Sequence, residues 1–197
     1  MEFSVQTANP AKAETACLVL PVYKGSDLLP AVAKLDDASE RLIGQLLERG
    51  DFDAVLGNTQ LVPFAPGLGA DRILLVGLGE RDKCQEAAFI KALDAAMTAL
   101  TKLPIDEACA TFTDVPLADR DAAWKARKTL EAVERAIYRF DQFKSSPAKA
   151  PSLAKLTLIV SDADDAPLAK QGAALGTAIG QGINFTRTLG NLPGNVC

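Results

Sequence analysis

The sequence of 197 residues contains no histidine. This absence excludes every site that uses imidazole as a base or metal ligand, including Ser-His-Asp triads, Cys-His pairs and histidine-ligated zinc. The four cysteines lie far apart and form no C-x-x-C pair, so neither a structural zinc site nor a disulfide scaffold is expected. The composition instead predicts buried reduced thiols. These are Cys17, Cys84, Cys109 and Cys197.

Long apolar runs and an excess of positive charge are also missing. The runs at 17–23 and 73–78 are too short to cross a bilayer, and the first residues resemble no signal peptide. A net charge of −4 weighs against a general nucleic-acid-binding protein, because binding phosphates requires clustered Lys and Arg. With 48% hydrophobic and 23% charged residues, the composition is typical of a globular domain with a real core. We expect a cytoplasmic protein.

Strand-like and helix-like segments alternate along most of the chain. Apolar, β-rich runs predict strands at 15–23, 71–78, 107–115 and 153–161, with a pair of short strands around Gly57-Asn58 within 54–64. Apolar residues three and four apart predict helices at 28–50, capped by Ser26 and Asp27, and at 84–101 and 119–143. Such alternation predicts an α/β domain with a largely parallel sheet and helices on both faces.

The region after Asp165 has a different composition. Residues 166–188 form a predicted helix in which Gly172, Gly176 and Gly180 share one face, a pattern that suits close packing against another element. We therefore predict an N-terminal domain at 1–165, followed at 166–197 by a linking helix and the start of a second domain. The glycine face is expected to pack on that second domain, outside this chain.

Gly77-Leu78-Gly79 is the one candidate for a phosphate-binding turn, because it follows a strand and precedes a helix. The full G-x-G-x-x-G pattern fails at Asp82, and Arg81 places a charge where a pyrophosphate needs bare backbone. A tight strand-to-helix turn is the favoured interpretation, with nucleotide binding as the alternative.

Charged clusters give two further candidates. Carboxylates gather at Asp36-Asp37, at Asp51 and Asp53, and in the loop 162–165, where a hard cation is the alternative to a solvated turn that caps the next helix. The segment 125–155 carries eight basic side chains against three acidic ones. It could bind nucleic acid or an acidic partner, but a solvated helix face with ordinary ion pairs is favoured.

Four motifs together resemble the leucyl aminopeptidase (cytosol aminopeptidase) family of two-metal exopeptidases. They are LIGQLLERGDF (42–52), RILLVGLGERD (72–82), AIYRFDQFKSS (136–146) and RTLGNLPGNVC (187–197). The last two are the most specific, and their order and spacing match the N-terminal domain of that family across essentially the whole chain. Two departures are visible: Thr188 replaces the usual Asp, and Gly194 replaces a common second proline.

The resemblance implies an N-terminal α/β domain of macro-domain-like topology, a linking helix and a C-terminal catalytic domain. It implies that the full-length protein is a metallo-aminopeptidase, a hexamer using two divalent ions, manganese or zinc. Those ions are held by Asp, Glu and Lys that lie downstream of residue 197. No residue of this chain is therefore assigned a catalytic, cofactor-binding or metal-binding role. The expected function is a non-catalytic assembly domain. The alternatives are a stand-alone macro-like nucleotide-binding module, or a nucleic-acid accessory domain using 125–155.

Overall fold

The computed structural model describes residues 1–25, 28–147 and 149–194. Within these residues six strands form a single sheet. The strands are β1 (Glu2–Thr7), β2 (Leu18–Tyr23), β3 (Thr59–Val62), β4 (Ile73–Gly79), β5 (Glu107–Ala110) and β6 (Lys155–Val160). Their spatial order is β1-β6-β5-β2-β4-β3, and neighbouring strands run parallel except for β3, which pairs antiparallel with β4. The mostly parallel α/β sheet predicted from the sequence is confirmed.

Helices cover both faces of this sheet. They are α1 (Pro30–Ala38), α2 (Leu42–Arg49), α3 (Glu86–Leu100), α4 (Ala122–Ile137) and α5 (Asp165–Asn191). The connections through α3 and α4 step across the sheet from β4 to β5 to β6, whereas the connection through α1 and α2 steps the opposite way, from β2 to β4. Because parallel crossovers are right-handed, these two sets of helices lie on opposite faces. Accordingly, every residue of β2 is buried.

The core forms where helix faces with apolar residues three and four apart meet the central strands. Phe89 of α3 contacts the rings of Phe112 and Trp124, each with centroids 5.8 Å apart, which joins α3 to α4. Asp121 begins α4 by accepting the backbone N–H of Trp124 at 2.8 Å, as an N-cap residue does. Both helices were predicted, although α4 ends at Ile137, because Tyr138 takes an extended backbone conformation.

The predicted helix at 28–50 is wrong as one element, because the chain breaks it into α1 and α2. Glu40 and Arg41 adopt positive φ angles of 55° and 62°, which turn the chain between the two helices. Asp36, buried near the end of α1, accepts the N–H groups of Ile43 at 2.8 Å and Gly44 at 2.9 Å, and so caps α2. This satisfies two orphan donors at the start of a new helix. The predicted caps Ser26 and Asp27 lie outside the described residues.

Two strand predictions also need correction. The segment 54–64 holds one strand, β3, rather than two, and the predicted strand 107–115 stops at Ala110, before a short 3-10 turn at Phe112–Asp114. In addition, β1 was not predicted. It forms an edge of the sheet by pairing with β6, about 150 residues away in the sequence, with Glu2 opposite Lys155.

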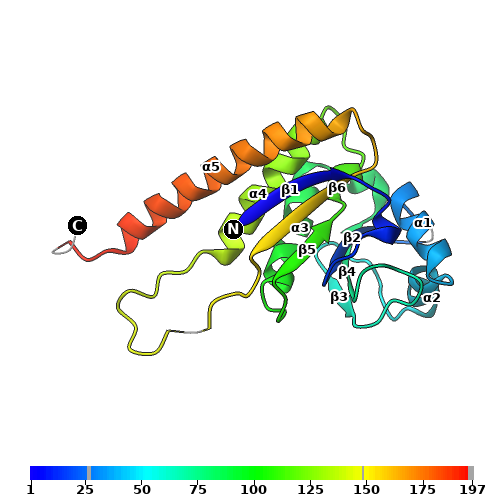
Figure 1. The fold of residues 1–197 in the computed structure, drawn as a ribbon, viewed down its shortest axis with the longest axis horizontal. Helices are drawn as coiled ribbons and strands as arrows, with labels where there is room; N and C mark the ends of the chain where they lie inside the picture. Colours follow the sequence, from blue (N-terminus) through cyan, green and yellow to red (C-terminus); the bar gives the residue numbers. More distant parts are fainter. Residues whose placement is uncertain (26–27, 148, 195–197) are drawn as a thin grey trace.

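The long helix α5 runs along one side of the molecule, and its C-terminal turns extend beyond the sheet (Figure 1). No described helix is long and apolar enough to span a membrane.

Candidate functional site

The N–H groups of Gly77 and Gly79, at the end of β4, already have acceptors within the chain. The N–H of Gly77 donates to the carbonyl of Asn58 at 2.8 Å, and the N–H of Gly79 donates to that of Ala54 at 3.0 Å. A Cβ at Gly77 would lie 2.1 Å from the carbonyl oxygen of Val55, so the chain itself fills the space. The glycines therefore permit a close backbone approach within the protein. They are the last residues of β4, and the 3-10 turn Arg81–Lys83 separates them from α3, so the prediction of a tight turn at these residues is wrong.

The carboxylate clusters likewise have structural partners. Asp53 accepts hydrogen bonds from the N–H of Val55 at 3.1 Å and the amide of Asn58 at 3.0 Å, and these bonds lower its pKa. Asp162 accepts the N–H of Asp164 at 3.0 Å, which closes a turn before α5. Across the described ranges, no group of three or more Cys, Asp or Glu side chains is placed to hold a metal ion.

A cavity of about 430 Å³ between α1, α2 and the end of β2 contains charges of both signs. Three of its polar side chains have partners within the chain: Arg41 pairs with Glu48, and Asp36 caps α2. Lys24 and Asp53 also line the cavity.

The described cysteines are buried thiols without disulfides. Burial is the main cause that raises the pKa of Cys17, to about 12, and burial also raises the pKa of Cys84 and Cys109. A thiol with a raised pKa is a poor nucleophile, because the thiolate is the reactive form. The prediction of reduced, structural thiols is confirmed for these three; Cys197 lies outside the described residues.

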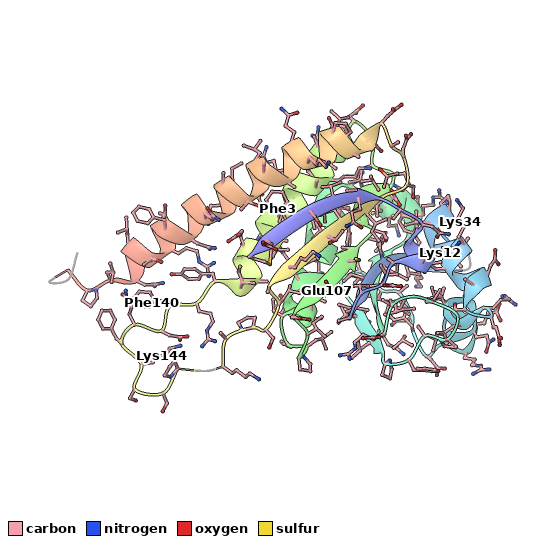
Figure 2. The ribbon with its side chains drawn as sticks, in the orientation of Figure 1. Phe3, Lys12, Lys34, Glu107, Phe140 and Lys144 are labelled. Atoms are coloured by element: carbon pink, nitrogen blue, oxygen red, sulfur yellow. The ribbon has the colours of Figure 1, made fainter. Side chains whose placement is uncertain are left out.

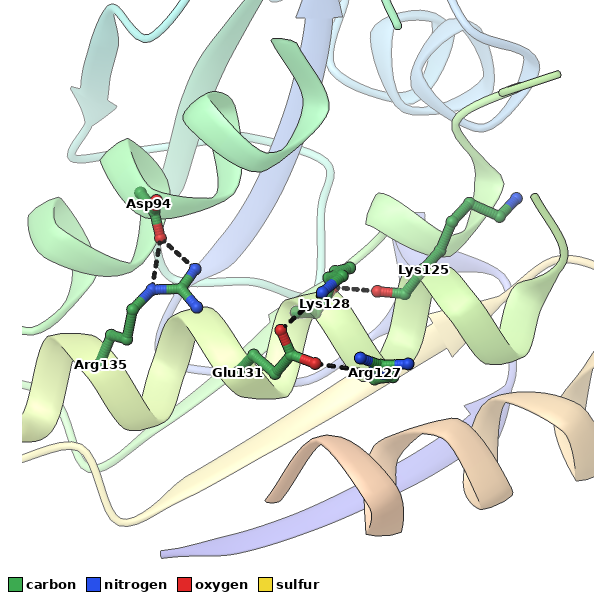
Figure 3. A network of polar contacts seen from close by, with 7 residues as sticks. Asp94, Lys125, Arg127, Lys128, Glu131 and Arg135 are labelled. Atoms are coloured by element: carbon green, nitrogen blue, oxygen red, sulfur yellow. Dashed lines mark hydrogen bonds and ion pairs between the residues drawn. The ribbon is translucent and has the colours of Figure 1, made fainter. Parts of the chain in front are cut away.

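Most basic side chains of the segment 125–155 form ion pairs or hydrogen bonds within the chain. On α4, Glu131 accepts the Nε of Arg127 at 2.7 Å and the Nζ of Lys128 at 2.8 Å (Figure 3). Further along α4, Arg135 forms an ion pair with Asp94 of α3, which Figure 3 also shows. Its Nη2 lies 2.6 Å from Asp94 Oδ1. The predicted ion pairs along the helix are present on α4, but the prediction of a solvated face is wrong for Lys125, Glu131 and Glu134, which are buried.

Three further cations of this segment, Lys125, Arg139 and Lys144, also have partners within the chain. Lys125 is buried and donates to the carbonyl of Val115 at 3.2 Å, while its burial lowers its pKa. Beyond the end of α4, Arg139 and Lys144 both pair with Asp141, and Figure 2 labels Lys144 on this part of the chain.

The glycine face of α5 packs on α4, within this chain, so the expectation that it packs on a second domain is wrong. A Cβ at Gly172 would lie 1.9 Å from the carbonyl oxygen of Ala123, and one at Gly176 would lie 2.3 Å from that of Arg127. Because the absence of side chains lets two helix backbones approach closely, these glycines fix α5 against α4. The two helices run parallel, since successive contacts advance together along both.

The last turns of α5 are attached to the end of α4 by polar and aromatic contacts that we call the Tyr138 cluster: Tyr138, Asn184, Arg187, Thr188 and Asn191. The guanidinium carbon of Arg187 lies 3.8 Å from the ring centroid of Tyr138, a cation–π contact. The amide of Asn191 donates to the Tyr138 hydroxyl at 3.2 Å, and that hydroxyl lies 3.3 Å from Thr188 Oγ1. The amide of Asn184 donates to the carbonyl of Glu134 at 2.8 Å, satisfying a carbonyl in the last turn of α4.

This cluster joins the two most specific sequence motifs, which lie about 50 residues apart in the chain. The first motif is 136–146, and the second is 187–197, of which the structure describes 187–194. The motifs themselves were visible in the sequence, but their contact was not, because it depends on the parallel packing of α4 and α5. Thr188, one of the two departures noted in the sequence, makes a polar contact to Tyr138. The candidate functional site is therefore the α4–α5 layer, in which glycine packing and the Tyr138 cluster join the two helices.

The fold defines the class of protein: a mostly parallel α/β domain with helices on both faces of its sheet. Comparisons with known proteins identify the family within this class. The chain matches the model of the cytosol aminopeptidase family, N-terminal domain, over residues 19–147. It is 69% identical over 197 residues to a probable cytosol aminopeptidase of Chromohalobacter salexigens, covering all of this chain and 39% of that relative. It is 39% identical over 199 residues to one of Halorhodospira halophila, covering all of this chain and 40% of that relative.

The chain therefore belongs to the cytosol aminopeptidase family, as the N-terminal portion of its members. It spans about 40% of the length of the relatives named above.

Solved structures show the same fold. A mutant of tomato leucine aminopeptidase has a TM-score of 0.78 at 18% identity, covering all of this chain and 39% of that one. The bottromycin maturation enzyme BotP in complex with Mn has a TM-score of 0.65 at 21% identity, covering 91% and 32%. The macro domain of ganglioside induced differentiation associated protein 2 has a TM-score of 0.64 at 12% identity, covering 89% and 84%. The macro-domain-like topology is thus confirmed.

Proposed function

We propose that this chain is the non-catalytic N-terminal assembly domain of a longer aminopeptidase, which releases N-terminal amino acids from peptides by two-metal hydrolysis. The observation that carries the proposal is the 69% identity across the whole chain to a probable cytosol aminopeptidase, of which it covers only the N-terminal 39%. The polar groups discussed above make contacts within the domain. This agrees with a domain that supports a reaction carried out by the region after residue 197.

We place the domain boundary near residue 165. Residues 1–165 then form the N-terminal α/β domain, and 166–197 form the linking helix and the start of the catalytic domain. The start of α5 at Asp165 supports this division.

We assign the two divalent ions, manganese or zinc, to the region that follows this chain. The described residues do not fit such a group, because they contain no cluster able to hold a metal. The structural neighbour BotP is in complex with Mn, which supports a divalent metal in the longer enzyme. Nothing in this chain takes a step in the hydrolysis; its partner is its own catalytic domain.

We further propose a cytoplasmic hexamer in which the N-terminal domains contribute contacts between subunits. The cytosolic names of the relatives support the cytoplasmic location.

Neither alternative is favoured by a specific observation. A nucleotide at Gly77–Gly79 would need N–H groups that already bind Asn58 and Ala54. A nucleic-acid surface at 125–155 would need cations that already pair with Glu131, Asp94 and Asp141.

The test is hydrolysis of leucine p-nitroanilide with Mn²⁺, by the full-length protein and by the 197-residue chain purified in parallel. We expect activity from the full-length protein and none from the chain alone. Activity of the chain alone would contradict its non-catalytic role, and an inactive full-length protein would contradict the assignment as an aminopeptidase.

A further inference from the structure

The outer side of α5 is exposed and carries an apolar stripe. Large apolar side chains there remain open to solvent: Leu168 is 41% exposed, Leu175 49%, Phe185 65% and Leu189 42%. This side faces away from α4, which the glycine face of the same helix contacts. A folded helix normally turns such residues inward, so the stripe indicates a surface that another element covers.

The spacing of the stripe suits contact with a second helix. Leu168, Leu175, Gly182 and Leu189 follow one another at intervals of seven residues, and Ala178 and Phe185 repeat the same interval three positions later. Apolar positions in this pattern form a continuous seam along a helix. A Cβ at Gly182 would meet nothing within 4 Å, so a partner backbone can approach the middle of the seam closely.

The lack of charged residues along the middle of α5 indicates what kind of partner its outer side contacts. Residues 171–186 contain no Asp, Glu, Lys or Arg, although much of this stretch is exposed. By contrast, α4 carries charges in nearly every turn. A partner that covers this stretch of α5 does not have to remove a charged side chain from water, and it finds no charged side chain to pair with. The partner that fits this surface is therefore an uncharged, apolar helix.

The area of the stripe favours a partner on the same chain. A helix of 27 residues is about 40 Å long and presents a face roughly 10 Å wide, so the contact covers on the order of 400 Å². Stable complexes between separate proteins bury about 800 Å² per partner. A tethered segment needs less, because its effective concentration is high.

We infer that this stripe, Leu168, Leu175, Ala178, Gly182, Phe185 and Leu189, is the surface on which the region following residue 197 packs in the full-length protein. The inference rests on the proposed function, since the relatives extend to about two and a half times the length of this chain. The stripe continues to Leu189, in the last turn of α5, so a chain leaving this helix reaches the surface directly. In this arrangement α5 is packed on both sides, with its glycine face on the N-terminal domain and its apolar stripe on the catalytic domain.

Hydroxyl-radical footprinting of the two proteins tests the inference. In the 197-residue chain Phe185 should be labelled strongly, and in the full-length protein it should lose most of that labelling. Phe64, which is 74% exposed beside β3 at the opposite edge of the sheet from β1, is the matched control and should be labelled in both. Equal labelling of Phe185 in both proteins would overturn the inference. Protection already present in the 197-residue chain, increasing with its concentration, would assign the stripe to a second copy and would also overturn it.

A pair of substitutions gives an independent measurement. Phe185→Glu should lower the Tm of the full-length protein and leave that of the 197-residue chain unchanged, whereas Phe64→Glu should leave both unchanged. An unchanged Tm for F185E in the full-length protein would count against the inference. Footprinting and Tm do not depend on catalysis, so a full-length protein without aminopeptidase activity would refute the proposed function and leave this test intact.

Discussion

Two buried glutamates, one turn apart on α4, have opposite electrostatic environments. Glu131 is buried, which raises its pKa, but hydrogen bonds and charges from Lys128 and Arg127 outweigh burial and lower the pKa overall. Glu134 packs against Gly180 of α5, and its burial raises its pKa despite the positive amino terminus nearby. One carboxylate therefore stabilises the fold when ionised, and the other costs stability.

Replacing Glu134 with Gln should stabilise the protein at pH 7. The folded pKa of Glu134 lies above its ordinary value of 4.5, so the ionised group costs stability at neutral pH, and the cost disappears as pH falls below 4.5. Urea unfolding at pH 7 and pH 4 should therefore show E134Q more stable than the wild type at pH 7, with the difference shrinking at pH 4. A variant that is less stable at pH 7 would contradict this account of Glu134.

Replacing Glu131 with Gln should have the opposite effect. Without the carboxylate, Arg127 and Lys128 lose their partner, and the free energy of unfolding at pH 7 should fall by about 1–3 kcal/mol. The folded pKa of Glu131 is lowered, so its contribution is present above 4.5 and is lost as pH falls through the folded pKa. The same urea series should show the deficit of E131Q shrinking in acid. A deficit independent of pH would mean that packing, rather than charge, explains the role of Glu131.

At the scale of elements, the parallel pair α4 and α5 determines the shape of the molecule. Glycines bring the two backbones together over the first turns of α5, and the Tyr138 cluster attaches its last turns. A helix held at both ends in this way projects its C-terminal turns beyond the sheet in a fixed direction (Figure 1).

Two glycines on α5, six residues apart, provide a matched test of this packing. Gly176→Ala would place a Cβ 2.3 Å from the carbonyl oxygen of Arg127, and should destabilise the 197-residue chain by about 1–3 kcal/mol. Gly182→Ala meets nothing within 4 Å, and should stabilise the same chain by up to about 1 kcal/mol, because Ala favours helix. Thermal unfolding should therefore separate the two variants in opposite directions. Similar effects from both would show that α5 does not pack on α4 as described.

Local sequence patterns predicted the elements whose signals are local. The strands β2, β4 and β6 and the helices α3 and α4 follow from apolar runs and from apolar residues three and four apart. The break between α1 and α2 was missed, because it depends on Asp36 reaching the start of the next helix. The edge strand β1 was missed because its partner β6 lies at the other end of the chain.

The candidate site was predictable only in part. The glycine spacing at 172–180 correctly indicated close helix packing, but the pattern names no partner, and the partner is α4. The motifs 136–146 and 187–197 identified the family, while the contact of Tyr138 with Arg187 requires the three-dimensional fold. Patterns within one element report which face is buried, whereas the neighbour of that face depends on topology.

At the scale of the whole molecule, the proposed function divides support and catalysis between this chain and the region that follows it. The chain lacks histidine, its described thiols are buried, and its described carboxylates and cations form no cluster that could hold a metal. It belongs to a family whose members continue well beyond it. The central claim is that metal binding and catalysis belong to the region after residue 197.

Metal content tests that claim most directly. The full-length protein and the 197-residue chain would each be incubated with excess Mn²⁺, dialysed, and measured by inductively coupled plasma mass spectrometry. We expect two divalent ions per full-length chain and none per 197-residue chain. An ion retained stoichiometrically by the 197-residue chain, or a full-length protein that retains none, would contradict it.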